Sequence, residues 1–141
     1  MFRIFIHIFF IVMVFSESGL CGETIYAKEL ESYMYVDGKM KHSKGQFEIT
    51  YLYEGDKIIR TRVYDLNKNE VIPDNTVYQI QRQLWSDPET NPPLKKQVIR
   101  GVGQPGKDAI EILSIEIDGD FIQSVKSTSN YFIISRYKRI K

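Results

Sequence analysis

Residues 109–140 read AIEILSIEIDGDFIQSVKSTSNYFIISRYKRI, and this stretch decides the fold. It divides into three predicted strands, residues 109–117, 121–127 and 131–138, which short polar segments separate. Isoleucine recurs in all three segments, and β-branched side chains fit a pleated sheet better than a helix. The stretch therefore predicts three antiparallel strands in series.

The alternation of apolar and polar residues gives each strand a predicted buried face. Side chains alternate with a period of two, so Leu113 and Ile117 share the apolar face of the first strand. A three-residue connection would place Ile117 opposite Phe121, whereas a two-residue Asp118-Gly119 turn would place it opposite Asp120. The longer connection keeps the apolar face continuous, and we therefore expect that register.

The rest of the chain adds strands of the same kind. Residues 47–53 alternate apolar and polar, and Gly55-Asp56 turns the chain into a second strand over residues 57–65. Residues 76–85 fit either a strand or an amphipathic helix, and the neighbouring strands favour a strand. We expect a proline-rich loop over residues 86–94, a strand over 95–102 and a bend over 103–106.

Seven to nine strands with short polar connections predict an all-β fold. Sequential strands joined by tight turns form an antiparallel up-and-down meander, which we expect to close into a small barrel. Residues 131–138 are partly apolar on both faces, which favours a closed sheet over an open edge. A two-sheet β-sandwich is the alternative.

Length and composition limit the classes of protein. The chain has 141 residues, of which 43% are hydrophobic and 26% charged, as in a globular domain of ordinary size. The formal net charge is +1, so no strong field recommends nucleic acid as a partner. The single cysteine excludes an intrachain disulfide framework.

The N-terminus predicts export. Arg3 precedes an uncharged run over residues 4–15, which is too short for a membrane-spanning helix and fits a signal peptide. We expect a signal peptide over residues 1–27, cleaved after Ala27 or after Ser18, and a single barrel-like domain over residues 28–141. The mature protein would be soluble in the periplasm or outside the cell. Leu20 argues against a lipid anchor at Cys21, because a lipoprotein signal has a small residue there.

Two spacings that resemble binding motifs predict turns instead. Residues 101–106 match G-x-G-x-x-G, but a strand follows where a dinucleotide site needs a helix. Asp65 begins a D-x-N-x-N run that resembles a calcium loop, yet Glu70 stands where that loop needs glycine. His42 is the one histidine outside the signal peptide, and it has no cysteine beside it. We therefore expect no metal site and no cofactor, and no set of residues predicts catalysis.

Arginines on apolar faces are the strongest candidate site residues. Arg82 shares a predicted face with Tyr78, and Arg100 shares one with Val98 and Val102. An arginine inside a barrel needs an anionic partner, which could be Glu111 or the carboxylate of a ligand. The ligand-binding residues that we predict are Arg82, Arg100, Tyr78 and Tyr51.

Three functional classes follow from these patterns, in decreasing order of support. The first is an exported barrel that binds an apolar or amphipathic small molecule, including an anionic one. The second is a non-enzymatic structural or interaction module of the cell envelope with a filled core, which uses exposed aromatics such as Trp85. An enzyme is third. None of the three needs nucleic acid or a membrane-spanning segment.

Overall fold

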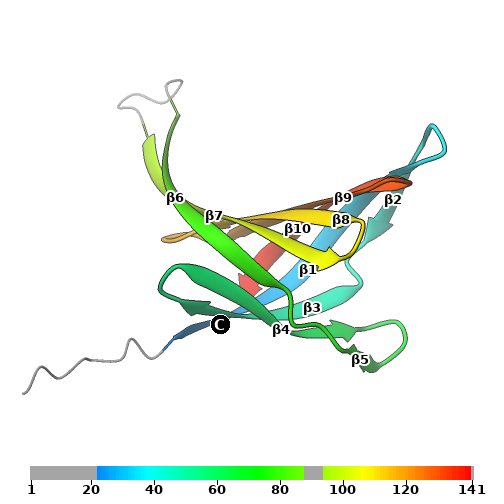
Figure 1. Cartoon of the computed structure of the whole chain (residues 1–141), viewed down its shortest axis with the longest axis horizontal. Helices are drawn as coiled ribbons and strands as arrows, with labels where there is room; N and C mark the ends of the chain where they lie inside the picture. The colour runs from blue at the N-terminus through cyan, green and yellow to red at the C-terminus, as the bar shows by residue number, and fades with distance from the viewer. Residues whose placement is uncertain (1–21, 88–93, 141) are drawn as a thin grey trace, which may run out of the picture.

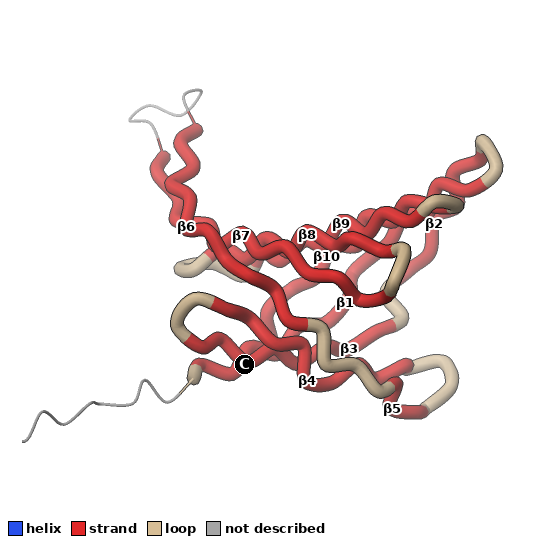
Figure 2. Tube along the Cα trace, viewed as in Figure 1, coloured by secondary structure: helices blue, strands red, loops and turns tan. Residues whose placement is uncertain are grey.

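The computed structural model describes residues 22–87 and 94–140, and the side chains of all of these except residues 82–87, 94 and 95. The described chain consists of strands and short connections (Figures 1 and 2). It contains no helix that is long and apolar enough to cross a membrane. The strands are β1 (Glu23–Val36), β2 (Lys39–Lys44), β3 (Phe47–Glu54), β4 (Lys57–Asp65), β5 (Glu70–Ile72), β6 (Val77–Asp87), β7 (Leu94–Gly106), β8 (Ala109–Glu116), β9 (Phe121–Thr128) and β10 (Tyr131–Ile140).

Eight of these strands form a closed antiparallel barrel. Around the barrel the order is β1, β3, β4, β6, β7, β8, β9 and β10, and β10 pairs with β1 to close it. The two remaining strands extend this wall, because β2 pairs with the second half of β1 and β5 pairs with the end of β4. The predicted all-β meander closed into a small barrel is confirmed.

The ladders between neighbouring strands of the barrel differ in length. β1 and β10 pair from Tyr26 and Ile140 to Val36 and Tyr131. In contrast, β4 and β6 pair only over Lys57–Ile59, opposite residues 77–79. The wall between β4 and β6 is therefore the shortest ladder in the described barrel.

The predicted register of β8 and β9 is wrong by one residue. Ile115 lies opposite Ile122 and Leu113 opposite Ser124, which is the register that a two-residue turn would set. Ile122 and Ser124 consequently face the interior, while Phe121 is exposed. The expectation failed because it required a continuously apolar inner face, whereas Ser124 lies opposite Ser135 and lines a cavity with polar groups.

The strand prediction for residues 76–85 is confirmed by β6, but the bend predicted over residues 103–106 is wrong. β7 continues to Gly106, with a register shift between Gly103 and Gly106. Gly103 lies against the ring of Tyr78, where a Cβ atom would stand 2.7 Å from Cδ1. The glycine therefore serves a close approach between strands. Most of the predicted loop over residues 86–94 lies outside the described residues.

Two β-bulges change which side chains point into the barrel. In β1, Leu30 has no partner in the ladder with β10, and in β4 Thr61 has none in the ladder with β3. Each extra residue shifts the alternation by one position. Glu29 and Arg60 immediately precede these bulges, and both are buried.

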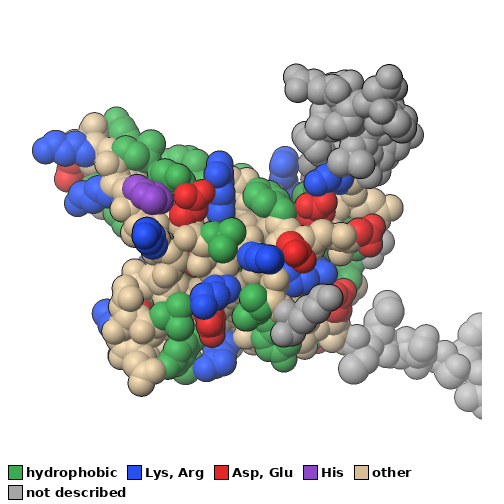
Figure 3. All heavy atoms as spheres, turned by 180° about the vertical axis from the view of Figure 1, so that it is seen from behind, with side chains coloured by type: hydrophobic (Ala, Val, Ile, Leu, Met, Phe, Trp, Pro, Cys, Tyr) green, Lys and Arg blue, Asp and Glu red, His purple; other side chains and the backbone are tan. Residues whose placement is uncertain are grey.

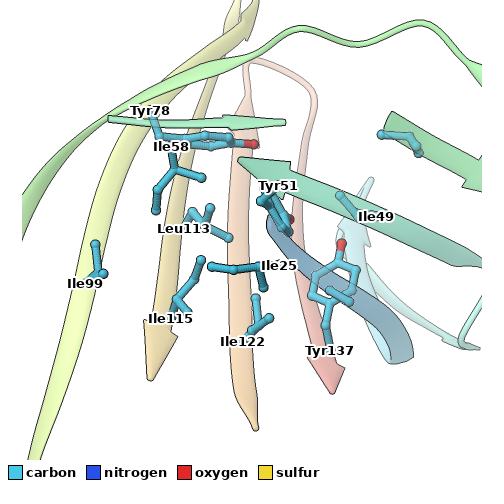
Figure 4. Close-up of a cluster of buried hydrophobic side chains, with 12 residues drawn as sticks. Ile25, Ile49, Tyr51, Ile58, Tyr78, Ile99, Leu113, Ile115, Ile122 and Tyr137 are labelled. Carbon is cyan, nitrogen blue, oxygen red and sulfur yellow. The ribbon is translucent and has the colours of Figure 1, made fainter. Parts of the chain in front are cut away.

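A hydrophobic core fills one part of the barrel. Side chains from strands all around the wall point into a common interior (Figure 4). Leucine, isoleucine and tyrosine fill this space at the middle of the ladders, as expected for the interior of an eight-stranded barrel. The buried members are Ile25, Ala27, Ile49, Tyr51, Ile58, Val63, Tyr78, Ile99, Leu113, Ile115, Ile122 and Tyr137.

The outer face carries charges of both signs. Basic and acidic side chains are interspersed on the face that Figure 3 shows, as a formal charge of +1 leads one to expect. Some form exposed pairs, such as Lys28 with Glu48 at 3.9 Å and Lys57 with Glu54 at 3.7 Å. Such exposed pairs contribute little to stability.

The beginning of β1 bears on the predicted signal peptide, most of which lies outside the described residues and stays a prediction. Residues 23–28 pair with β3, and Ile25 and Ala27 are buried in the core. Cleavage after Ala27 would remove these core residues, whereas cleavage after Ser18 would leave β1 whole.

We expect a chain that begins at Gly19 to form the barrel and a chain that begins at Lys28 to fail, because the second lacks most of the β1–β3 ladder. Far-ultraviolet circular dichroism and urea unfolding of the two chains measure this difference. Equal urea midpoints for both chains would contradict it.

Candidate binding cavity

A cavity of about 630 Å³ lies inside the barrel and is lined by residues of β1, β3, β4, β8, β9 and β10, with others from β2 and β5 at its rim. The strands β2 and β5 lie at the same end of the barrel (Figure 1). The apolar wall of the cavity comes from side chains on five strands, and a binding site for an apolar group requires such a wall. The apolar lining residues are Met34, Phe47, Ile49, Val63, Ile72 and Ile133.

Arg60 lies buried at the cavity wall between two carboxylates. Its Nη1 donates to both carboxylate oxygens of Glu111 at 2.9 Å. Its Nη2 donates to Oδ2 of Asp74 at 2.8 Å and to Oγ1 of Thr76 at 3.2 Å. Both terminal nitrogens of the guanidinium group therefore have partners from β8 and from the segment between β5 and β6.

The pKa values reflect this pairing. Burial alone would lower the pKa of Arg60, but the hydrogen bond to Asp74 and the charge of Glu111 outweigh burial and raise it. Burial opposes ionisation of Asp74, yet the hydrogen bond from Arg60 keeps the pKa of that carboxyl below its usual value. Arg60 and Asp74 are therefore held in their charged forms, and the hydrogen bonds to Glu111 link β4 to β8.

Two fully buried tyrosines lie beneath the Arg60 network. The rings of Tyr51 and Tyr78 meet edge to face at 6.4 Å between centroids, and the Arg60 guanidinium lies 5.7 Å from the centre of the Tyr78 ring. Neither hydroxyl forms a hydrogen bond within the described part of the chain. Burial is the main cause that raises the pKa of both phenols. These rings belong to the hydrophobic core and form the floor on which the Arg60 network lies.

A second polar group lines the cavity on β1, β9 and β10. Tyr137 lies opposite Glu29 in the β1–β10 ladder, and Ser135 lies opposite Ser124 in the next ladder. All four side chains are buried and line the cavity. Burial, and then the negative charge of Glu29, raise the pKa of Tyr137 to about 12.

Glu29 is the acid that this second group surrounds. Its residue is 4% exposed, and its Oε2 accepts a hydrogen bond from the backbone N–H of Gln46 at 2.8 Å. None of the basic side chains in the described ranges forms an ion pair with it. Gly45 makes this arrangement possible, because a Cβ there would stand 1.8 Å from the carbonyl oxygen of Glu29.

In the loop that resembles a calcium site, the Asp65 carboxylate accepts hydrogen bonds from other residues of the protein. Oδ1 of Asp65 accepts from the backbone N–H groups of Asn67 and Lys68, and Oδ2 accepts from Nε2 of Gln46. The described residues also contain no cluster of three or more metal-ligating side chains. This loop is an Asx-type turn that closes the end of β4.

The four predicted ligand-binding residues do not come together in one site. Tyr51 and Tyr78 lie in the floor and do not line the cavity. Arg100 is exposed on the outer face, so the expectation that its face points into the barrel is wrong. Arg82 lies opposite Ile99 in the β6–β7 ladder, and its side chain lies outside the described ones, so its ligand contact stays a prediction. Glu111 is buried with an arginine as expected, but the arginine is Arg60.

Arg60 and Glu29 are the residues that the sequence pattern missed. Arg60 lies in phase with Ile58, and Val63 and Asp65 follow out of phase with it. Two apolar positions five residues apart, Ile58 and Val63, share one face only when a bulge lies between them. That break in the period of two was the available signal.

Comparison with known proteins adds no identity. No protein-family model, no curated protein and no solved structure matches this chain.

Loss of the Arg60 side chain should destabilise the fold strongly. Arg60→Met leaves Glu111 and Asp74 without their cation, and removing one partner of a buried ion pair costs about 3–5 kcal/mol. Urea unfolding measures the change. The exposed Arg100→Met is the matched control and should change stability by less than about 0.5 kcal/mol. Equal urea midpoints for the two variants would contradict the role of Arg60.

The buried tyrosines predict a loss of stability at alkaline pH. A phenol in the unfolded chain has a pKa of about 10, below the raised values of Tyr51, Tyr78 and Tyr137. The stability from these neutral phenols is fully present below about pH 10, and the share of Tyr137 is lost as the pH rises through about 12.

A titration followed by tyrosinate absorbance and circular dichroism measures this loss. We expect these phenols to ionise as the barrel unfolds, and Tyr137→Phe to reduce the alkaline fall in urea midpoint. Complete tyrosine ionisation with an intact circular dichroism spectrum would contradict this expectation.

Proposed function

We propose that the protein is a small exported β-barrel binding protein that holds one apolar or amphipathic small molecule in its cavity. The single observation that carries the proposal is the cavity itself, at about 630 Å³ inside the barrel. Pockets that bind small molecules are typically about 300–1,000 Å³, with apolar walls and a few polar groups.

The distribution of side chains supports a preformed site. Aliphatic groups line the walls, whereas polar groups gather at Arg60 and at Glu29. The Arg60 network joins β4, β8 and the segment before β6, so the polar groups are held in place without a ligand. Preorganised polar groups in an apolar cavity orient a ligand at low entropic cost.

The alternative function, an interaction module with a filled core and no ligand, predicts a barrel whose interior is packed throughout. Tyr51, Tyr78 and Leu113 fill one part of the barrel, whereas the inward positions 124 and 135 beside the cavity carry small serine side chains. This difference favours the binding protein over the interaction module. Export is part of the proposal because the N-terminal run over residues 4–15 has the pattern of a signal peptide.

Binding of an uncharged fluorescent probe tests the proposal. We expect N-phenyl-1-naphthylamine to bind the native protein saturably at one molecule per chain. Ser124→Phe fills the cavity from β9 and should abolish this binding, whereas Ser127→Phe adds the same ring to the exposed face of β9 and should not. Urea unfolding of both variants controls for stability.

Two results would count against a ligand cavity. One is the absence of saturable probe binding to the native protein, and the other is equal binding by the two phenylalanine variants. Native mass spectrometry of the protein from its natural compartment adds an independent measurement, since it shows a bound molecule or a bare mass.

A further inference from the structure

The cation inside the barrel is already neutralised by two carboxylates. Both terminal nitrogens of Arg60 donate to Glu111, Asp74 and Thr76, and its Nε is buried without a partner in the described chain. A ligand carboxylate at a terminal nitrogen would have to displace one of two buried acids from this arginine, and at Nε it would be a third negative charge beside one cation. That displacement would leave a buried acid unpaired, which is strongly unfavourable.

The acid Glu29 has the opposite property. It is 4% exposed, it lines the cavity, and no described basic group pairs with it. Its hydrogen bond from Gln46 occupies one carboxylate oxygen, and the other accepts no hydrogen bond from a described residue. A buried carboxylate without a cation is unfavourable, and a positively charged group placed beside it would relieve that cost.

The remaining basic side chains at the cavity do not reach Glu29. Lys41 lies exposed on β2, at the rim. Lys126 lies opposite Glu111 in the β8–β9 ladder, but its ammonium group is 6.0 Å from the centre of the Tyr131 ring. His42 pairs with Glu31 at 3.5 Å and stacks on Tyr33. Each of the last two is engaged elsewhere.

The groups around Glu29 suit an ammonium ion. An amine that carries a proton has up to three N–H donors and no acceptor. Glu29 offers a carboxylate oxygen, and the hydroxyl groups of Ser124, Ser135 and Tyr137 line the same cavity. The aliphatic wall at Ile49 accommodates an apolar chain attached to it.

We propose that the ligand of this cavity is an amphiphile with a protonated amine, which binds Glu29 while its apolar part lies along the aliphatic wall. This inference rests on the proposed function, since it names the class of molecule that the same cavity holds. Glu29 and the three hydroxyl groups set the specificity, whereas Arg60 connects β4 with β8 and with the segment before β6.

Three molecules with the same decyl chain test the inference. Decylamine, decanol and decanoate carry a positive, a neutral and a negative head group, and each is titrated against bound N-phenyl-1-naphthylamine below its micellar concentration. We expect decylamine to displace the probe at about tenfold lower concentration than decanol, as a charge-assisted hydrogen bond implies, and decanoate to be the weakest.

Two matched variants assign the preference to Glu29. Glu29→Gln keeps the acceptor for Gln46 and should remove the difference between decylamine and decanol while it still binds the probe. Glu48→Gln changes an acid that pairs with Lys28 on the outer face and should leave the difference unchanged.

The outcomes separate this inference from the proposed function. Decanoate as the strongest competitor, or a decylamine preference that survives in Glu29→Gln, overturns the amine assignment although the probe binds. Failure of the native protein to bind the probe overturns the proposed function and the inference together. The ranking of the three molecules on the native protein is decisive even if a variant does not fold.

Discussion

A charged guanidinium group inside a narrow barrel has to be neutralised where it stands, and this requirement organises the structure. Arg60 satisfies it with a carboxylate from β8 and another from the segment that leads into β6. These partners lie far apart in the sequence, so the ion pairs connect two sides of the wall. Apolar residues in place of Arg60 and its two partners could pack without fixing the distances between these strands. A buried ion pair therefore contributes more to the relative position of the strands than to the net free energy of folding.

The barrel consists of a packed part and an open part that depend on each other. Tyr51 and Tyr78 fill the packed part and form the floor on which the Arg60 network lies. The open part is bordered by Ser124 and Ser135 and by the segments of β1 and β4 that follow the β-bulges. Glu29 and Arg60 lie in phase with the buried Ala27 and Ile58. After each bulge the inward phase changes, so that Met34 and Val63 line the cavity instead of facing outward.

The fold could be predicted from the sequence because alternation and turn residues are local signals. The three C-terminal strands and the strand over residues 76–85 follow from them. The site could not be predicted in the same way, because a bulge changes the inward face without a characteristic residue type. Thr61 and Leu30 are ordinary strand residues, yet each reverses which of the following side chains point inward. Likewise, Ser124 gave no sign that a polar residue would face inward.

The ladder between β1 and β10 has a consequence for the order of assembly. It joins the beginning of the described barrel to its last strand, so its contacts are among the most distant in the sequence. Closure of such a long loop carries an entropic cost before any contact forms, and hairpins such as β8–β9 form sooner. The barrel therefore cannot close during synthesis until β10 has been made. Until then, β1 lacks one of its neighbours, and the backbone groups that later pair with β10 stay unpaired along its edge.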